Sequence, residues 1–266
     1  MGRTLDVDRR DGIASVVMHR NDNNAIAGDL CQELGEAFDS LGAAPEVRVV
    51  VLRSGYERYF SVGADLGAMA SVDREGPGAE DRIAEMMEGA ARGFAAIERC
   101  PKPVIAAING HALGGGCELA LCCDYRIMAE DGRSRIGQTE VTLGIIPGAG
   151  GTQRLPRLIG RARALPLLLE GRRLSAREAE EIGLVSRAVA PEDLESAVAE
   201  LAERLAKGAT RAIALIKETV DRGLELPLEE AMKLEARNFA RASLTEDAVI
   251  GVMSFMAKQE PEFKGR

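Results

Sequence analysis

The chain has 266 residues, 46% of them apolar and 29% charged, which is typical of a globular protein with one large domain or a domain plus an appendage. The formal net charge is −8 and no block of Lys or Arg occurs, which argues against a nucleic-acid partner because phosphate contacts require clustered basic residues. No run reaches the roughly 20 apolar residues of a membrane helix, and the first residues, MGRTLD, resemble neither a signal peptide nor a myristoylation site, so we expect a cytoplasmic protein without membrane contact.

The first half of the chain alternates predicted strands with predicted helices. Short apolar runs predict strands over residues 13–19, 47–54, 102–110 and 124–130. Apolar residues at helical spacing predict helices over residues 28–43, 80–99 and 114–123. Alternation at this pitch indicates an α/β fold with largely parallel strand pairing.

The segment 71–81, SVDREGPGAED, interrupts this alternation. It is acidic and contains Gly and Pro, which is typical of a mobile loop. We interpret it as a plain connector, with a lid over a binding site as the less favoured alternative.

From about residue 161 the pattern changes to one helix after another. Ser175 and Glu178 form a capping-box pattern at the start of one of them. Four further helices are predicted over residues 192–208, 210–223, 227–242 and 245–259. We therefore divide the chain into an α/β domain, residues 1–190, and an all-helical region, residues 191–266, whose excess apolar stripes indicate subunit contacts.

The chain has five cysteines and two histidines, and their spacing matches no zinc site. Three of the cysteines lie in one apolar run, residues 117–123. We expect buried, reduced thiols and no bound metal.

Glycine-rich turns follow predicted strands at residues 61–66, 112–119 and 144–155. Such a turn at a helix start leaves backbone N–H groups pointing at a ligand, with the positive end of the helix dipole behind them. Neither phosphate-binding glycine pattern occurs and no Lys lies near these turns, so a phosphate loop is improbable. An oxyanion of smaller charge, such as an enolate held by two N–H groups, suits them better.

Two glutamates accompany these turns. Glu118 follows the three glycines of ALGGGCEL, and Glu140 lies in GQTEVTLG. Each taken alone fits an ordinary helix cap or a surface charge. If both face one pocket, they form a carboxylate pair for acid–base chemistry beside an enolate, but their spacing alone does not bring them together.

Four stretches of the sequence together resemble one enzyme family: FSVGADL, NGHALGGGCELALCCDYRI, GQTEVTLGIIPGAGGTQRLPRLIG and LSAREAEEIGLVSRAV. They are similar to the enoyl-CoA hydratase/isomerase (crotonase) superfamily, and the likeness runs from about residue 5 to the final EFKG. The resemblance implies a spiral of ββα units followed by a C-terminal all-helical trimerisation region, assembled as a homotrimer or a dimer of trimers. It also implies an acyl-CoA thioester as the substrate, so that coenzyme A is part of the substrate and no separate cofactor is expected.

The resemblance also assigns roles to residues. Backbone amides of Ala64 and Gly115 match the oxyanion hole, Glu118 matches the base that activates water, Glu140 matches the acid that protonates C2, and the amide of Gly148 matches a water contact. Further residues match the coenzyme A cleft. They are Ala25, Ala64, Asp65, Leu66, Gly67 and Gly115, with Phe255 and Lys258 often contributed by a neighbouring subunit.

Both glutamates are present, and this favours a hydratase. Moving a proton from C4 to C2 needs a single base, whereas adding water needs one group to deprotonate it and another to protonate carbon. A Δ3,Δ2-enoyl-CoA isomerase is the enzymatic alternative. A non-catalytic acyl-CoA binder or an RNA-binding relative is disfavoured by the intact pair and by the acidic charge. The sequence departs from the family pattern in HRND at 19–22, which lacks the usual Pro, and in Thr139, where Pro is common. These departures and the 71–81 segment bear on substrate chain length and coenzyme A contacts.

Overall fold

Two β-sheets form the centre of the computed structural model, which describes residues 4–73 and 75–266. The larger sheet has the order β1-β2-β3-β5-β7-β9, and the smaller one has the order β4-β6-β8. The strands of the larger sheet are β1 Leu5–Arg10, β2 Ile13–Met18, β3 Val49–Ser54, β5 Val104–Ile108, β7 Tyr125–Ala129 and β9 Arg187–Val189. Those of the smaller sheet are β4 Tyr59–Ser61, β6 His111–Leu113 and β8 Ile136–Gly137.

All pairings between these strands are parallel except that of β1 with β2, which confirms the predicted α/β class. The central strands β3 and β5 are buried on both faces, which explains their continuous apolar sequences VVVL and VIAAI. Val50 and Leu52 point into one core cluster, and Val49 and Val51 point into another on the opposite face.

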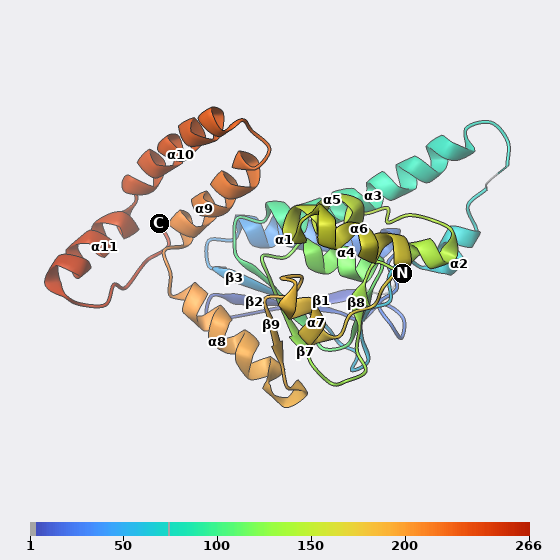
Figure 1. Ribbon diagram of the computed structural model, residues 1–266. Helices are drawn as coiled ribbons and strands as arrows, with labels where there is room; N and C mark the ends of the chain where they lie inside the picture. The colour runs from blue at the N-terminus through green and yellow to red at the C-terminus, as the bar shows by residue number, and fades with distance from the viewer. Residues whose placement is uncertain (1–3, 74) are drawn as a thin grey trace.

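Helices cover both faces of the larger sheet (Figure 1). One face packs against a layer that includes α1 Gly28–Ala43, α3 Ala79–Arg99, α4 Gly115–Leu121, α5 Gly151–Ile159 and α6 Arg161–Glu170. The other face packs against α8 Leu194–Ala206, whose buried residues include Leu194 and Val198. The remaining short helices of the body are α2 Leu66–Ala70, α7 Ala176–Glu181 and the 3₁₀ helices η1 Glu140–Leu143 and η2 Pro191–Asp193.

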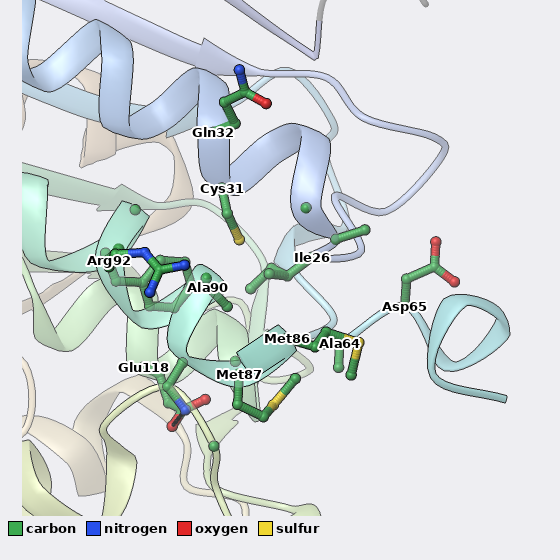
Figure 2. A pocket seen from close by; sticks show the side chains of 18 of the residues that line it. Ile26, Cys31, Gln32, Ala64, Asp65, Met86, Met87, Ala90, Arg92 and Glu118 are labelled. Atoms are coloured by element: carbon green, nitrogen blue, oxygen red, sulfur yellow. Dashed lines mark hydrogen bonds between the residues drawn. The ribbon is translucent and has the colours of Figure 1, made fainter. Parts of the chain in front are cut away.

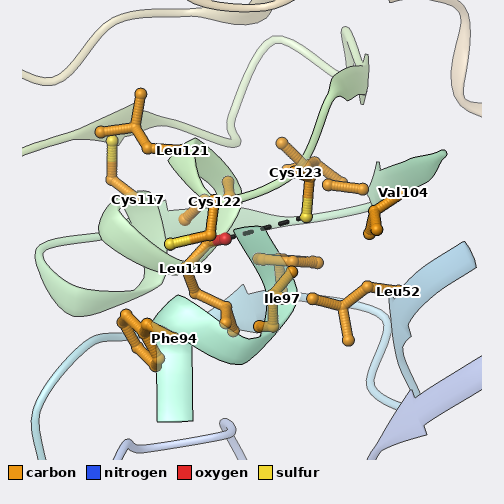
Figure 3. Packing of buried hydrophobic residues seen from close by; sticks show 14 of the residues in the cluster. Leu52, Phe94, Ile97, Val104, Cys117, Leu119, Leu121, Cys122 and Cys123 are labelled. Carbon is orange, nitrogen blue, oxygen red and sulfur yellow. Dashed lines mark hydrogen bonds between the residues drawn. The ribbon is translucent and has the colours of Figure 1, made fainter. Parts of the chain in front are cut away.

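The cysteines belong to the core beneath this helical layer. Figure 3 shows Cys117, Cys122 and Cys123 on and just after α4, packed with Leu119 and with Ile97 of α3. All five cysteines of the chain are buried free thiols, as predicted. Desolvation raises the pKa of the Cys117 thiol far above its usual range, so this thiol is unsuited to act as a nucleophile.

The last three helices stand away from the sheets at one end of the molecule (Figure 1). They are α9 Thr210–Gly223, α10 Leu228–Ser243 and α11 Glu246–Ala257. The division of the chain at residue 190 stays a prediction; in the structure α8 lies on the sheet, and the projecting helices start at α9.

Two sequence-based interpretations fall partly outside the described residues. The absence of a targeting signal involves residues 1–3, and the predicted 71–81 loop includes Arg74. Helix α2 ends at Ala70, directly before that segment, and α3 already begins within it at Ala79. No helix of the described chain combines the length and the apolar character required to cross a membrane.

Candidate active site

The three glycines before Glu118 bring α4 close to its neighbours. Gly114 has φ 53°, a left-handed conformation that L-residues rarely adopt, and it turns the chain from β6 into α4. A Cβ on Gly116 would lie 2.3 Å from the carbonyl oxygen of Ser61. Glycine is therefore required for α4 to pack against β4. This explains why residues that are poor helix formers stand at the start of a helix.

Glu118 lies in the first turn of α4 with only 3% of its surface exposed. Its Oε1 accepts hydrogen bonds from the backbone N–H groups of Ala149, at 2.8 Å, and Gly151, at 2.7 Å. Burial raises the pKa of the Glu118 carboxyl, and the two N–H donors oppose that effect because they stabilise the ionised form. The charge is thus held in a defined position.

Glu140 begins η1 and reaches the same region from another element. Its Oε1 lies 2.8 Å from the position that a Cβ on Gly114 would occupy, so the carboxyl group rests over the glycine turn. Burial, reinforced by the negative charge of Glu118, raises the pKa of Glu140 to about 7. The buried Gln138 amide, oriented with its nitrogen toward Glu140, lies 3.3 Å from both carboxylate oxygens. At neutral pH a large fraction of Glu140 is therefore protonated.

The N–H groups of Ala64 and Gly115 lie close together between the two glycine turns. Ile26 donates to the carbonyl of Gly63 at 2.7 Å and Asp65 donates to the carbonyl of Ile26 at 2.9 Å, which fixes the loop around Ala64. A Cβ built on Gly115 would lie 3.6 Å from the Ala64 nitrogen. Within the described residues neither N–H has an acceptor. The two amides are available to a ligand oxygen.

Two cavities meet at this point. The larger, of about 1350 Å³, is mainly apolar and is lined by Glu118, Glu140 and Gly148 together with side chains such as Met86 and Met87 of α3 (Figure 2). The smaller, of about 460 Å³, is lined by Ala25 and Leu66, among others. Residues shared by both cavities are Ala64, Asp65, Met69, Gly115, Glu140 and Ile145. The shared residues thus include the amide pair and one glutamate.

Asp65 anchors the loop between these cavities. One carboxylate oxygen accepts from the N–H groups of Gly67 and Ala68 at 3.0 and 3.1 Å, and the other accepts from Arg20 at 3.0 Å. The Ala68 and Arg20 bonds lower the pKa of Asp65. Arg20 also donates to the carbonyl of Ala25 at 2.8 Å. Gly67 thus serves the loop through its N–H and lines neither cavity.

The structure brings most of the predicted site residues together; besides Gly67, two others lie outside both cavities. Phe255 and Lys258 lie at the end of α11, and they line neither of the two cavities. Phe255 is 86% exposed. Their predicted role, which involves a neighbouring subunit, stays a prediction.

Sequence reasoning missed three side chains that shape the site. Arg20 lies in the HRND stretch, which departs from the family pattern by its missing Pro, and Gln138 lies two residues before Glu140. Met87 packs over Gly148, where an added Cβ would lie 2.7 Å from its sulfur. Only Gln138 had a sequence signal, its place beside a candidate acid.

The sequence matches the Enoyl-CoA hydratase/isomerase family over residues 8–266. It is 40% identical over 264 residues to a "Probable enoyl-CoA hydratase" of Rhizobium meliloti, covering 99% of this chain and 98% of that protein. It is 38% identical over 243 residues to a "Crotonyl-CoA hydratase" of Syntrophomonas wolfei, covering 90% of this chain and 89% of the relative.

Solved structures agree with the sequence comparison. The crystal structure of an enoyl-CoA hydratase from Bacillus anthracis superposes with a TM-score of 0.91 at 38% identity, over 99% of this chain and 100% of that one. The chain therefore belongs to the enoyl-CoA hydratase/isomerase (crotonase) family. The predicted fold, a spiral α/β body followed by C-terminal helices, is confirmed.

Proposed function

We propose that this protein is an enoyl-CoA hydratase that adds water across the C2=C3 double bond of a 2-enoyl-CoA thioester to give a 3-hydroxyacyl-CoA. The observation that carries the proposal is the environment of the two glutamates. Burial raises the pKa of both carboxyl groups, that of Glu140 to about 7, and at Glu118 two backbone hydrogen bonds oppose the rise because they favour the ionised form. A base and an acid beside one cavity are what hydration requires.

In the proposed reaction, the thioester oxygen accepts hydrogen bonds from the N–H groups of Ala64 and Gly115. Glu118 takes a proton from a water molecule, which the Gly148 N–H helps to hold, and the water oxygen forms a bond to C3. The C2=C3 electron pair moves toward the thioester as an enolate, which the two amides stabilise. The enolate then collapses and C2 takes the proton of the Glu140 carboxyl. Water is consumed, and proton transfer from Glu118 to Glu140 through solvent restores both groups.

The two cavities support a division of the substrate. The larger, apolar cavity suits the acyl chain, and the smaller one, beside Ala25, Asp65 and Leu66, suits the coenzyme A side of the thioester. The shared N–H groups of Ala64 and Gly115 then lie at the reacting carbonyl. The relative from Syntrophomonas wolfei carries the name of a crotonyl-CoA hydratase, so crotonyl-CoA is the first substrate to test.

Purified Glu118→Gln and Glu140→Gln variants test the assignment. Each is expected to hydrate crotonyl-CoA roughly 10²–10⁴-fold more slowly than wild type, because each lacks one proton-transfer group. Glu180→Gln, at an exposed position on α7 that lines neither cavity, is the matched control and should retain the wild-type rate. A wild-type rate in either cavity variant would contradict the mechanism.

A comparison of two substrates distinguishes the hydratase from the isomerase alternative. Wild-type protein is assayed side by side on a 2-enoyl-CoA and a 3-enoyl-CoA of equal chain length. We expect hydration of the 2-enoyl substrate. Turnover of the 3-enoyl substrate alone would replace the hydratase with a Δ3,Δ2-enoyl-CoA isomerase.

A further inference from the structure

Arg154, on the first turn of α5, forms a hydrogen-bonded link between two elements that flank the cavity. Its Nη1 donates to the carbonyl oxygen of Ala149 at 2.9 Å. Its Nε and Nη2 donate to the two carboxylate oxygens of Glu98, at 3.2 and 2.7 Å. Glu98 belongs to α3, which lines the larger cavity with residues from Ile83 to Arg99. The guanidinium thus joins α3 to the loop that precedes α5.

The same stretch of chain, at the start of α5, donates the hydrogen bonds to the Glu118 carboxylate on α4. The N–H of Ala149 donates to Glu118 Oε1, while the carbonyl of the same residue accepts from Arg154. Gly150 has φ 109°, and a Cβ there would overlap the Arg154 guanidinium. Gly150 therefore lets Arg154 lie directly against the loop. A shift of Arg154 would move both N–H donors of Glu118.

Arg154 also supplies a positive charge near Glu118 without lying in the substrate's path. It lines neither of the two cavities that meet at Ala64 and Gly115. Together with Glu98 it lines a separate cavity of about 600 Å³ beside α9. Any effect of Arg154 on catalysis must therefore pass through another residue.

Several charged or titratable groups surround this pair. The groups around Arg154 and Glu98 are Glu118 and Cys122 on α4 and just after it, Asp124 and Arg126 at β7, and Lys217 and Asp221 on α9. Glu140 on η1 faces Glu118. Lys217 is paired with Asp124 at 2.5 Å, and Arg126 donates to the carbonyls of Leu184 and Cys123. Of these three cations, Arg154 is the one that donates a hydrogen bond to the loop before α5, at the carbonyl of Ala149. Burial raises the pKa of Glu118, whereas the N–H donors of Gly151 and Ala149 and the charge of Arg154 oppose that shift.

We propose that Arg154, anchored by Glu98, is a positioning residue that fixes the loop donating to Glu118 and keeps this carboxylate ionised for the proposed hydration. The proposal rests on the proposed function, because it assigns Glu118 the role of base. It extends that function by two residues of α3 and α5 that never touch the substrate.

The test is the pH profile of kcat/KM for crotonyl-CoA in Arg154→Met and Arg154→Lys. Arg154→Met removes the charge, so we expect the acidic limb, where Glu118 takes up a proton, to move to higher pH. We also expect kcat to fall roughly 10- to 100-fold from misplacement of the base, with KM changed less than kcat. Arg154→Lys keeps the charge and one donor and should restore the position of the limb.

Two further variants separate the proposed role from general damage. Glu98→Gln keeps the cation, so its acidic limb should not move to higher pH even where kcat falls. Arg157→Met is the matched control, since Arg157 lies on the same helix, is exposed and donates only to Gln153. It should match wild type in both rate and profile. An Arg154→Met profile that superposes on wild type after scaling, or an equal upward shift in Glu98→Gln, would overturn the proposal.

A measurement without substrate distinguishes this proposal from the proposed function. The Glu118 carboxyl resonance is followed by NMR in protein labelled with δ-¹³C glutamate, assigned by its loss in Glu118→Gln. Its titration midpoint should lie at higher pH in Arg154→Met than in wild type, whether or not crotonyl-CoA is hydrated. Equal midpoints would refute the role of Arg154, whereas an inactive wild type with shifted midpoints would refute the hydratase alone.

Discussion

The two glutamates of the cavity differ in the partners of their carboxylates. Glu118 has two backbone N–H donors on one oxygen, whereas at Glu140 burial and the negative charge of Glu118 outweigh the backbone N–H groups of Glu140 and Thr139, which lower the pKa. Backbone donors stabilise an anion, and a neighbouring anion disfavours a second one. In the proposed mechanism, two residues of one type thus take opposite proton-transfer roles because their surroundings differ.

Glu140 is expected to reduce stability at neutral and alkaline pH. Its folded pKa of about 7 lies above the unfolded value of about 4.3, so between these values the unfolded chain releases a proton that the folded chain retains. Stability falls as pH rises through this window, and the loss is complete above it. We therefore expect Glu140→Gln to melt at the same temperature as wild type at pH 4 and at a higher temperature at pH 8.

Melting curves by circular dichroism at both pH values check this prediction. Glu180→Gln, on the surface of α7, is the control and should show no pH-dependent difference. A lower melting temperature of Glu140→Gln at pH 8 would contradict it. A variant that gains stability while losing activity is typical of a catalytic group held in an unfavourable environment.

Individual site residues were predictable from sequence to different degrees. Glu118 and Gly115 share one motif in which glycines precede a charge at a helix start. The roles of both residues could therefore be predicted from this short stretch of sequence. Glu98 and Arg154 lie on two helices, 56 residues apart in sequence, and each looks like a residue of a solvated helix face. Their link depends on how α3 packs beside α5, which local periodicity does not specify.

At the scale of elements, most helices were predicted closely, whereas five strands, β1, β4, β6, β8 and β9, were not predicted. The predicted helix 28–43 coincides with α1, because its apolar residues repeat at helical spacing around Leu30, Leu34 and Phe38. The capping box of Ser175 and Glu178 is present at α7. The first strand, β1, escaped because its sequence LDVDRR is exposed beyond Leu5 and lies at the edge of the sheet. Backbone pairing with β2, rather than an apolar sequence pattern, holds β1 in the sheet.

The contact between α1 and α3 depends on glycine. A Cβ on Gly93 would lie 2.3 Å from the carbonyl oxygen of Cys31. We expect Gly93→Ala to separate the helices and to lower the free energy of unfolding by about 1–3 kcal/mol, because backbone cannot yield as a side chain can. Urea unfolding measures this change. Because both helices line the larger cavity, KM for crotonyl-CoA should rise as well.

Gly89→Ala, one turn earlier on α3, is the matched control. A Cβ there meets only the end of the Arg92 side chain, at 3.8 Å. Alanine should therefore stabilise the helix by about 0.5–1 kcal/mol through its better helix propensity. Equal effects of the two substitutions would show that propensity, rather than the close approach of α1, decides the outcome at Gly93.

At the scale of the whole molecule, the projecting helices expose more apolar surface than a lone chain usually does. Large apolar side chains of α9 to α11 that are more than half exposed are Ile216, Val220, Leu228, Met232, Phe239, Val249, Val252, Met253, Phe255 and Met256. Surfaces of this kind are typical of protein–protein contacts. They favour contacts between subunits, and they were recognisable from sequence as helical stripes in excess of what the sheet can cover. The homotrimer or dimer of trimers stays a prediction.

We expect wild-type protein to sediment as three or six chains and the double variant Val252→Glu/Met253→Glu to dissociate, because charges placed on this surface would have to be buried. Gln259→Glu adds a charge at an exposed polar position just beyond α11 and should leave the assembly intact.

If Phe255 and Lys258 reach the coenzyme A of a neighbouring subunit, as the family resemblance implies, the dissociated variant should also show a raised KM. Phe255→Ala and Lys258→Ala should then raise KM in the intact assembly, with kcat less affected. A wild-type protein that is monomeric and still hydrates crotonyl-CoA would exclude both the predicted assembly and a coenzyme A site shared between subunits.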